Sequence, residues 1–439
     1  MHILQITNHG LHEWQVTPGL PDTGGQNVYV NNLSAAFVRL GHRVTIVNRG
    51  GYPHPLTGEM RTGTIPGLDG SAEIVYLSDG TPSFVRKEDM EDQLPALATE
   101  LDTLMKQRRF DLILSHYWDG ALLGVLANRM QVDPVRHLWI PHSLGALKRR
   151  NVDRAKWPEL RIDERIAAER RVLAEIDGVV ATSVAIRDST QDDYAARADY
   201  FLPPGIDHDR YQPRSQSECE PIWGFLADVM QVDPEHLQGR PLILEVSRTD
   251  TTKRKDVLLR AFAAVVETVP RPLLAVTIDD SNEAVHATLL DLIEELGVRD
   301  DIAILGSVWD ELPCLYSEAD IYCTPSIMEG FGMSAQEAAA TATPVVASDR
   351  VPFAAEYLLG PEPAIHDLPG SGSIVVGEGA VVVPADSIAG FAAALELLLN
   401  DAELRTRLGE SAYRATVPAF GWDRLAASFL EEIDQVGNA

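Results

Sequence analysis

Cysteine is scarce in this sequence. Its 439 residues include three cysteines, scattered at Cys219, Cys314 and Cys323. Cysteines so few and so widely spaced exclude a disulfide framework and a cysteine-based metal site, and they are typical of a reducing compartment. We expect Cys314 and Cys323 to lie in or near the core. Long apolar segments are missing too, because no run approaches the roughly 20 residues that a membrane-spanning helix requires.

Basic residues are also few relative to acidic ones. The sequence has 37 lysines and arginines against 65 aspartates and glutamates, so its formal net charge is -28 at pH 7. This excess argues against nucleic acid or an anionic membrane as a general partner. A basic leader segment is not expected, since residues 2–6 already have the composition of a first β-strand. We therefore expect a cytoplasmic protein without a nucleic-acid or membrane partner, and its oligomeric state stays open.

Short aliphatic segments alternate with helical ones throughout the chain. With 45% hydrophobic residues, the sequence can fill the cores of two domains or of one large one. In the helix predicted over residues 27–40, apolar side chains recur every three or four positions, and Gly41 ends the pattern. The alternation predicts an α/β fold with two Rossmann-like, doubly wound parallel sheets that face across a cleft. The predicted strands are residues 2–6, 43–48, 74–77, 112–115, 137–140 and 178–182, then 242–246, 273–278, 302–305, 321–324, 345–348 and 381–383.

The domain boundary is predicted after Pro203-Pro204-Gly205, where the chain becomes polar and rich in proline. The first domain would comprise residues 1–205 together with a returning C-terminal helix over about 419–439. The second would comprise residues 206–418. A short helix is expected at residues 223–230, and the segment 360–380, rich in glycine and proline, is expected to be an inserted loop.

The most informative segment is Glu329-Gly330-Phe331-Gly332-Met333-Ser334, which leads from a predicted strand into a helix that carries Glu337. A helix N-terminus offers free amides and the positive end of the helix dipole, and both suit a phosphate. The two carboxylates accept hydrogen bonds from sugar hydroxyls. The segment could also be an ordinary connection with surface glutamates. Its functional interpretation is a nucleotide-sugar site.

Two further cations follow the predicted strand 242–246 at its carboxyl end. Arg248 and Lys253 could neutralise a diphosphate and stabilise it as it departs. The alternative is a solvated basic loop, which is the usual meaning of a run such as residues 253–255. Of that run, we expect only Lys253 to face the cleft.

The first loop of the chain ends in Gly24-Gly25-Gln26. Adjacent glycines let a ligand approach the backbone, and the following helix can meet negative charge, although a plain tight turn would also explain them. The loop lacks GxGxxG, so a dinucleotide-dependent dehydrogenase is not supported. His142 follows the strand predicted at 137–140, and its place at a strand end favours the cleft over a purely structural role.

A local excess of positive charge occurs at residues 148–171. This segment has nine basic and five acidic side chains within a strongly acidic protein. Such an excess predicts an anionic ligand, for example a phosphorylated sugar. A helix face of alternating charge would account for part of the pattern.

Taken together, the Thr23–Gln26 loop, the segment His142-Ser143-Leu144-Gly145, the pair Arg248 and Lys253, and the carboxylates Glu329 and Glu337 resemble a known family. The chain is similar to the retaining glycosyltransferases of family 4, which have the GT-B fold. The similarity extends over most of the chain and is greatest to the branch of sucrose-phosphate synthase and sucrose synthase.

The resemblance implies a role for each matched residue. The C-terminal domain would bind the donor: Arg248 and Lys253 hold its diphosphate, Glu337 its ribose hydroxyls and Glu329 its hexose hydroxyls. The amides of Gly330, Phe331, Gly332, Met333 and Ser334 would face the hexose and phosphate. The N-terminal domain would bind the acceptor through Gly24, Gly25, Gln26, Lys87, Lys148 and Arg165, with His142 contacting the transferred sugar. Arg248, Lys253, Glu329 and His142 would be the catalytic residues.

The implied reaction is transfer of glucose from UDP- or ADP-glucose to a small phosphorylated sugar, such as fructose 6-phosphate, with retained configuration. The departing diphosphate would take the proton of the acceptor, so no metal and no cofactor is expected.

Glu164 stands where the branch usually has an arginine, and this keeps a second reaction open: transfer to fructose, glycerate or a cyclitol, or a related phosphorylase reaction. A nucleotide-sugar-binding protein without turnover is the more remote alternative, and a glycosidase is disfavoured because no carboxylate pair positions a water.

Overall fold

The structure is a computed structural model that describes residues 1–17, 20, 22–368 and 372–437. The chain forms two compact units. The first comprises Met1–Gly205 and the C-terminal segment from Trp422, and the second comprises Ile206–Gly421. The chain thus leaves the first unit at the predicted residue and returns at 421/422, slightly later than the predicted 418/419.

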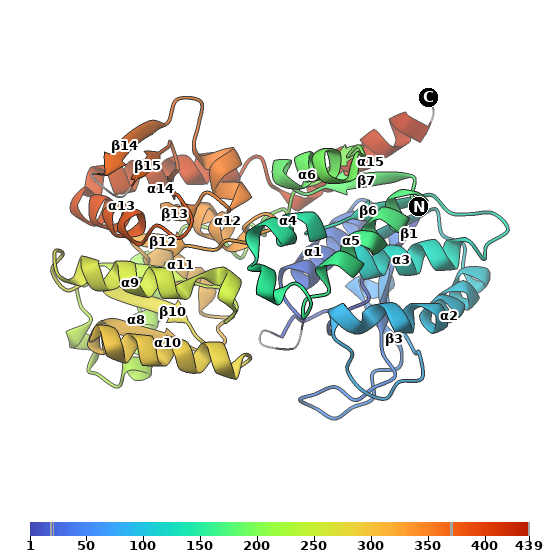
Figure 1. Ribbon diagram of the computed structural model, residues 1–439, viewed down its shortest axis with the longest axis horizontal. Helices are drawn as coiled ribbons and strands as arrows, with labels where there is room; N and C mark the ends of the chain where they lie inside the picture. Colours follow the sequence, from blue (N-terminus) through green and yellow to red (C-terminus); the bar gives the residue numbers. More distant parts are fainter. Residues whose placement is uncertain (18–19, 21, 369–371, 438–439) are drawn as a thin grey trace. The chain divides into compact units, whose positions relative to one another are not determined.

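A mixed, mainly parallel sheet forms the centre of the first unit (Figure 1). Among the described strands of this sheet, only β3 runs antiparallel, and it pairs with β4 at one edge. In sheet order, the strands are β3 (Gly63–Gly67), β4 (Ala72–Leu77), β2 (Arg43–Arg49), β1 (His2–Ile6), β5 (Leu112–His116), β6 (His137–Ile140), β7 (Gly178–Ala181) and β8 (Tyr200–Phe201). The helices are α1 (Gly25–Arg39), α2 (Leu94–Gln107), α3 (Tyr117–Asn128), α4 (Gly145–Asn151), α5 (Ile162–Leu173), α6 (Val184–Tyr194) and α15 (Trp422–Gly437).

Helices cover both faces of this sheet, as in a doubly wound fold. On one face, α1 and α15 bury a cluster that includes Leu33, Phe37 and Phe429 against β1, β2 and β5. On the other face, α2, α3 and α5 bury a second cluster that includes Leu101 and Trp139. Alternate residues of each strand therefore point into opposite cores.

The second unit repeats this architecture around its own sheet (Figure 1). In sheet order, its strands are β11 (Ile302–Leu305), β10 (Leu273–Thr277), β9 (Leu242–Glu245), β12 (Ile321–Thr324), β13 (Val345–Ser348), β16 (Ala380–Val383), β15 (Gly372–Val376) and β14 (Ala364–Leu368). The helices are α7 (Gln216–Cys219), α8 (Pro221–Met230), α9 (Lys255–Val266), α10 (Glu283–Leu296), α11 (Leu312–Glu318), α12 (Met333–Ala340), α13 (Ile388–Asn400) and α14 (Ala402–Thr416). The predicted fold class is confirmed.

The prediction that residues 360–380 form an inserted loop is wrong in part. This segment contains the antiparallel strands β14 and β15, which extend the sheet from β16. Ile374 of β15 is buried, whereas Ile365 of β14 is 69% exposed. Glycines and prolines dominate the local composition and are typical of loops, so the sequence pattern of the two short strands between them was hidden. Residues 369–371 lie outside the described part of the chain.

The cysteines are unpaired. Cys323 and Cys219 are buried and Cys314 is partly exposed. Cys323 therefore lies in the core as expected, whereas Cys314 lies nearer the surface.

Candidate active site

The order of strands in the second unit reverses at β9. The chain proceeds from β9 to β10 on one side and later places β12 on the other. In open α/β sheets, ligands bind at the carboxyl ends of the strands at such a reversal. The loops after β9 and β12 meet there: the Ile327 amide donates to the Thr252 carbonyl at 2.9 Å, and the Ser326 hydroxyl donates to the same carbonyl at 3.3 Å.

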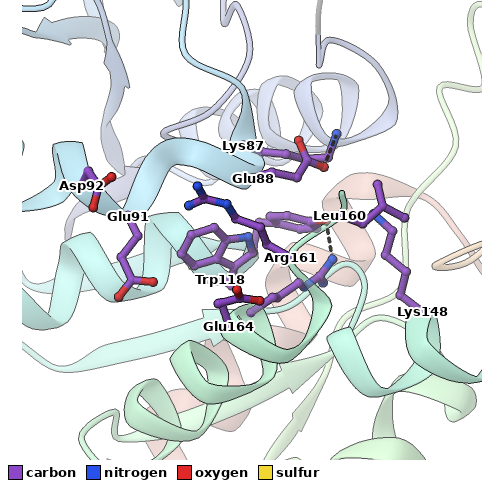
Figure 2. Close-up of a pocket in the computed structure, with 11 residues that line it drawn as sticks. Lys87, Glu88, Glu91, Asp92, Trp118, Lys148, Leu160, Arg161 and Glu164 are labelled. Carbon is purple, nitrogen blue, oxygen red and sulfur yellow. Dashed lines mark hydrogen bonds and ion pairs between the residues drawn. The ribbon is translucent and has the colours of Figure 1, made fainter. Parts of the chain in front are cut away.

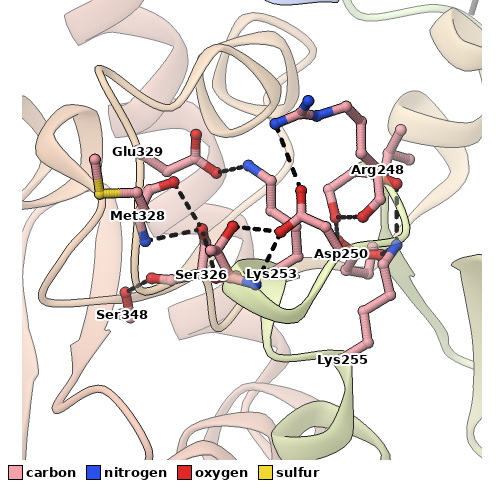
Figure 3. Close-up of polar contacts among 12 residues, drawn as sticks. Arg248, Asp250, Lys253, Lys255, Ser326, Met328, Glu329 and Ser348 are labelled. Atoms are coloured by element: carbon pink, nitrogen blue, oxygen red, sulfur yellow. Dashed lines mark hydrogen bonds and ion pairs between the residues drawn. The ribbon is translucent and has the colours of Figure 1, made fainter. Parts of the chain in front are cut away.

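Lys253 and Glu329 form an ion pair across these two loops. The Lys253 Nζ lies 2.6 Å from Glu329 Oε1, and Lys253 is only 9% exposed (Figure 3). A cation and a carboxylate predicted from segments 76 residues apart are thus held together. Because the pair is largely enclosed, each side chain fixes the position of the other.

Arg248 extends from the same loop and its side chain is 61% exposed (Figure 3). Its guanidinium lies 3.4 Å from the Asp250 carboxylate. Burial alone would raise the pKa of Asp250, but Arg248, Lys253 and hydrogen bonds from Thr252 lower it overall. Asp250 therefore carries a negative charge that holds Arg248 beside Lys253.

The other two residues of the basic run point elsewhere. Lys255 is buried, and its Nζ donates to Glu245 Oε2 at 2.8 Å beneath the sheet end. Burial lowers the pKa of Lys255. The Arg254 Nε donates to Asp256 at 3.0 Å. Of the run 253–255, Lys253 is therefore the residue that reaches Glu329.

Helix α12 begins at the glycine-containing loop. Gly332 precedes it with φ of 106°, and a Cβ there would lie 2.6 Å from Val351 Cγ1, so the position requires glycine. The Phe331 ring points inward and packs on Phe353 and Phe420, with ring centroids 5.4 and 5.9 Å apart. Only the backbone of Phe331 therefore remains for a ligand, together with the amides of the first helical turn.

Glu337 lies on α12 with its carboxyl beside two tyrosines. The Tyr316 hydroxyl donates to Glu337 Oε2 at 2.9 Å. Burial raises the pKa of Glu337 to about 7, although hydrogen bonds from Tyr316 and Tyr211 and the charge of Arg210 act in the opposite direction. The carboxyl consequently changes charge near neutral pH.

In the first unit the strand order reverses between β1 and β5, and the first loop lies at the carboxyl end of β1. Gly24 is the N-cap of α1, and Gly25 is exposed in its first turn. The Gln26 amide donates to the Thr7 hydroxyl at 2.9 Å. The predicted trio therefore stands at the helix N-terminus, with an exposed backbone at Gly25.

His142 follows β6 in an unusual conformation. Its φ is 55°, and the Ser143 amide donates to the Pro141 carbonyl at 2.6 Å, which places His142 at the centre of a three-residue turn. Its Nε2 lies 2.9 Å from His116 Nδ1. Burial, with a smaller effect of nearby His9, lowers the pKa of His142 to about 3. The ring is therefore neutral at physiological pH.

Three of the predicted acceptor residues line a single pocket of the first unit. Lys87, Lys148 and Arg165 form its wall with Trp118 and Arg161 (Figure 2). Lys87 belongs to a 3₁₀ segment, Lys87–Gln93, while Lys148 lies on α4 and Arg165 on α5. The structure thus brings together cations from three separate elements.

The charge of this pocket is balanced, in contrast to the predicted local excess. Its wall carries as many acidic side chains as basic ones, the acidic ones being Glu88, Glu91, Asp92 and Glu164. Other basic residues of 148–171 pair outside it, as Arg150 does with Asp193 at 2.5 Å. Composition alone could not show this, because charges adjacent in sequence point to different sides of α4 and α5.

Two of the pocket cations already have ion-pair partners. The Lys87 Nζ pairs with Asp22. The Arg165 Nε donates to Glu169 at 2.8 Å, and its guanidinium lies over the Tyr117 ring at 4.2 Å. An anion in this pocket would share Arg165 with Glu169.

Comparison with known proteins decides the family. Residues 23–210 match the family described as Glycosyltransferase Family 4, and residues 230–415 match the one described as Glycosyl transferases group 1. Mannosylfructose-phosphate synthase of Agrobacterium fabrum is 30% identical over 78% of this chain and 75% of its own. The chain belongs to glycosyltransferase family 4.

Two other matches extend across this glycosyltransferase. D-inositol 3-phosphate glycosyltransferase of Kineococcus radiotolerans is 30% identical over 94% of this chain and 91% of its own. The solved structure of sucrose-phosphate synthase from Thermosynechococcus elongatus superposes with a TM-score of 0.81, covering 100% of this chain and 99% of that one at 22% identity. This structural likeness shows the GT-B fold.

Sequence reasoning missed several polar groups of this family 4 glycosyltransferase. His9 Nδ1 lies 2.8 Å from Asp119 Oδ1 in the first unit, and His116 contacts His142. His116 ends β5 and Asp119 lies three residues later in the first turn of α3, so the rule that placed His142 at a strand end could have found them. Tyr211 and Tyr316, beside Glu337, carried no such signal, because buried tyrosines look like ordinary core residues.

Metal-binding clusters and membrane-spanning helices are both missing from the described residues. Within the described residues, no group of three or more histidine, cysteine or acidic side chains is arranged to hold a metal ion. The same part of the glycosyltransferase contains no helix with the length and apolar character needed to cross a membrane.

Proposed function

We propose that the protein is a retaining glycosyltransferase that moves glucose from a nucleotide sugar, UDP- or ADP-glucose, to a small phosphorylated sugar such as fructose 6-phosphate. The observation that carries the proposal is the enclosed Lys253–Glu329 pair at the strand reversal of the second unit, where N···O is 2.6 Å. A cation for the diphosphate and an acceptor for sugar hydroxyls stand side by side there.

The donor would be held by its charged and hydroxyl groups. Lys253, Arg248 and the first amides of α12 take the diphosphate, as cations and helix N-termini do. Glu329 accepts from hexose hydroxyls and Glu337 from the ribose. A carboxylate bound to a lysine is a poor nucleophile, so Glu329 supports binding and charge stabilisation better than a covalent intermediate.

The transfer step follows from this arrangement. The bond from the anomeric carbon to the diphosphate oxygen breaks, and a bond to the acceptor oxygen forms on the same face. The acceptor proton passes to the departing diphosphate, whose charge Arg248 and Lys253 stabilise. Because these cations neutralise the leaving group, we propose that no metal is required, and activity should survive chelation by EDTA.

The phosphorylated acceptor is supported by the pocket that Lys87, Lys148 and Arg165 line. The names of the related proteins point the same way, since mannosylfructose-phosphate synthase and D-inositol 3-phosphate glycosyltransferase both include a phosphate. Gly24, Gly25 and Gln26 would contact the acceptor at the N-terminus of α1. His142 would contact the transferred sugar.

A second candidate is transfer to an acceptor without phosphate, such as fructose, glycerate or a cyclitol. It is favoured by the acidic side chains of the same pocket, Glu164 among them. Initial rates with each acceptor and its phosphate ester separate the two. A kcat/KM that is indifferent to the phosphate would favour this second candidate and contradict the first.

Turnover tests the donor site. We expect Lys253→Ala and Glu329→Ala each to lower kcat by about a hundred- to thousandfold, the loss seen when one preorganised charge-stabilising group is removed. The measurement is nucleoside diphosphate release in a coupled assay, with circular dichroism to confirm folding. Glu410→Ala is the matched control, because its pair with Arg414 on α14 is exposed and 3.6 Å long. Activity at the wild-type level in either site variant would reject the donor assignment, and absence of turnover in the wild type would leave a binding protein.

A further inference from the structure

A continuous series of hydrogen bonds runs from α1 to His142 through the core of the first unit. It begins at Ser34, whose hydroxyl donates its single proton to the Val30 carbonyl at 2.7 Å. Ser34 Oγ must therefore accept from its other neighbour, the Gln5 amide nitrogen, at 2.5 Å. This fixes the orientation of the Gln5 side chain, with its carbonyl oxygen pointing away from Ser34.

The next bond fixes a proton on His116. The Gln5 carbonyl oxygen lies 2.9 Å from His116 Nε2, and a carbonyl can only accept, so Nε2 carries hydrogen. His116 is fully buried, and burial lowers its pKa well below the usual value. A neutral imidazole has one N–H, so His116 Nδ1 is a bare acceptor. The contact of 2.9 Å to His142 Nε2 then requires that His142 donate.

Backbone and packing hold the His142 ring in place. The turn that runs from the Ser143 amide to the Pro141 carbonyl fixes its Cα with φ of 55°. The Tyr29 ring meets the His142 ring edge-on with centroids 4.8 Å apart, and the Tyr29 hydroxyl is itself anchored on the Leu202 carbonyl. A flip of the ring would break the bond to His116.

The other nitrogen of His142 is left for a ligand. None of the described residues hydrogen-bonds Nδ1, and this atom is not among the described polar atoms that are sealed in the core without a partner. The titratable groups that face the ring are His116 on β5, His9 after β1 and Tyr29 on α1. None of them is a carboxylate that could stabilise a doubly protonated ring.

We infer that Ser34, Gln5 and His116 are positioning residues that lock His142 as the neutral Nε2–H tautomer, so that Nδ1 accepts a hydrogen bond from a hydroxyl of the sugar substrate. The inference rests on the proposed function for the presence of that hydroxyl. It assigns His142 the role of an acceptor that orients the sugar, and it excludes His142 as a proton donor to the leaving group.

The proton positions can be read directly by NMR. With ¹⁵N-labelled histidine in the full-length protein, and His142→Gln to assign the resonance, we expect His142 to show a protonated Nε2 and an unprotonated Nδ1 throughout the stable pH range. His12 is the internal reference, because its Nε2 contacts Asn31 Oδ1 at 2.9 Å outside this series. A proton on Nδ1 of His142 would overturn the inference, whatever the activity of the enzyme.

Variants of Gln5 connect the tautomer to turnover. Gln5→Leu removes the oriented carbonyl, so His142 should become a mixture of tautomers and kcat should fall about three- to tenfold, the effect of one hydrogen bond. Gln5→Glu places a carboxylate against His116 Nε2 and favours a doubly protonated His116, whose Nδ1 then donates, so His142 should lose the Nε2–H tautomer in this variant as well. KM for the acceptor should stay within about twofold in both variants. The hydrogen bond that is lost goes to the transferred sugar, so its loss does not change binding of the acceptor.

The two possible failures are distinguishable. If Gln5→Leu scrambles the tautomer and leaves kcat unchanged, His142 does not contact the sugar, although glycosyl transfer measured in the same assay stands. If the wild type transfers no sugar at all, the proposed function fails while the NMR result on the tautomer is unaffected. Ser34→Ala provides an independent variant, with the same expected mixture of tautomers.

Discussion

The carboxyl of Glu337 is held between opposing influences. Its burial favours the neutral acid, whereas the hydroxyls of Tyr316 and Tyr211 and the charge of Arg210 favour the carboxylate. Burial prevails and raises the pKa to about 7. A group proposed to accept hydrogen bonds from ribose thus changes its charge near the pH at which the enzyme would operate.

This balance predicts a pH dependence of donor binding. Below pH 7 the neutral acid is the weaker acceptor, and above pH 7 the carboxylate predominates, so affinity should increase with pH. From pH 6 to pH 8 the ionised fraction grows about tenfold, and KM for the nucleotide sugar should fall by up to that factor. Initial rates across this range measure it.

The control for this prediction is Glu337→Gln, which cannot ionise. Its KM for the donor should be higher than that of the wild type at pH 8 and nearly independent of pH. If the variant keeps the slope of the wild type, another group is responsible and Glu337 is not the titrating contact.

At the scale of elements, the connection from β12 to α12 shows how backbone geometry prepares the proposed phosphate site. Gly332 starts the helix with φ of 106°, and the Val351 side chain leaves no space for a Cβ. The Phe331 ring, packed on Phe353, anchors the preceding residue. Gly332 and the buried ring of Phe331 thus fix the orientation of the first amides of α12.

Replacing that glycine should damage both stability and donor binding. Gly332→Ala places a side chain at positive φ, which costs about 1–2 kcal/mol, and its contact with Val351 adds about 1–3 kcal/mol. Urea unfolding and KM for the donor should both show the effect. Gly224→Ala on α8 is the control of opposite sign: nothing lies within 4 Å of its Cβ position, and alanine favours a helix interior by about 0.5–1 kcal/mol. Equal effects of the two changes would contradict this account.

The ends of parallel strands were the most predictable part of the molecule. Lys253 and Glu329 were placed at strand ends from aliphatic segments followed by charged or glycine-containing loops, and the structure pairs them. The hairpin of β14 and β15 was not predictable in that way, because its short strands bury few side chains. The series from Ser34 to His142 was also beyond sequence reasoning, because it joins residues 29, 111 and 26 positions apart through side-chain geometry alone.

At the scale of the molecule, the chain closes its first unit with its last helix. Trp422, Phe429 and Ile433 of α15 are 5%, 1% and 4% exposed, and they belong to the same core cluster as Leu33 of α1. The Phe429 ring meets Tyr200 of β8 edge-on with centroids 5.9 Å apart. The proposed acceptor residues are therefore carried by a unit whose core is complete only when the end of the chain has returned to it.

This topology predicts that a destabilising substitution in α15 lowers the stability of the first unit. Phe429→Ala should lower the free energy of unfolding of that unit by about 3–5 kcal/mol, the usual cost of truncating a buried phenylalanine. Hydrogen exchange followed by mass spectrometry should show faster exchange in β1, β2 and β5, with β9, β12 and β13 of the second unit unchanged. Asp423→Ala is the control on the same helix: its pair with Arg39 is more than half exposed on both sides, so the loss should stay below about 1 kcal/mol. Equal acceleration in both sheets after Phe429→Ala would show that the two units unfold as one cooperative body, and the division into units would then describe geometry without describing stability.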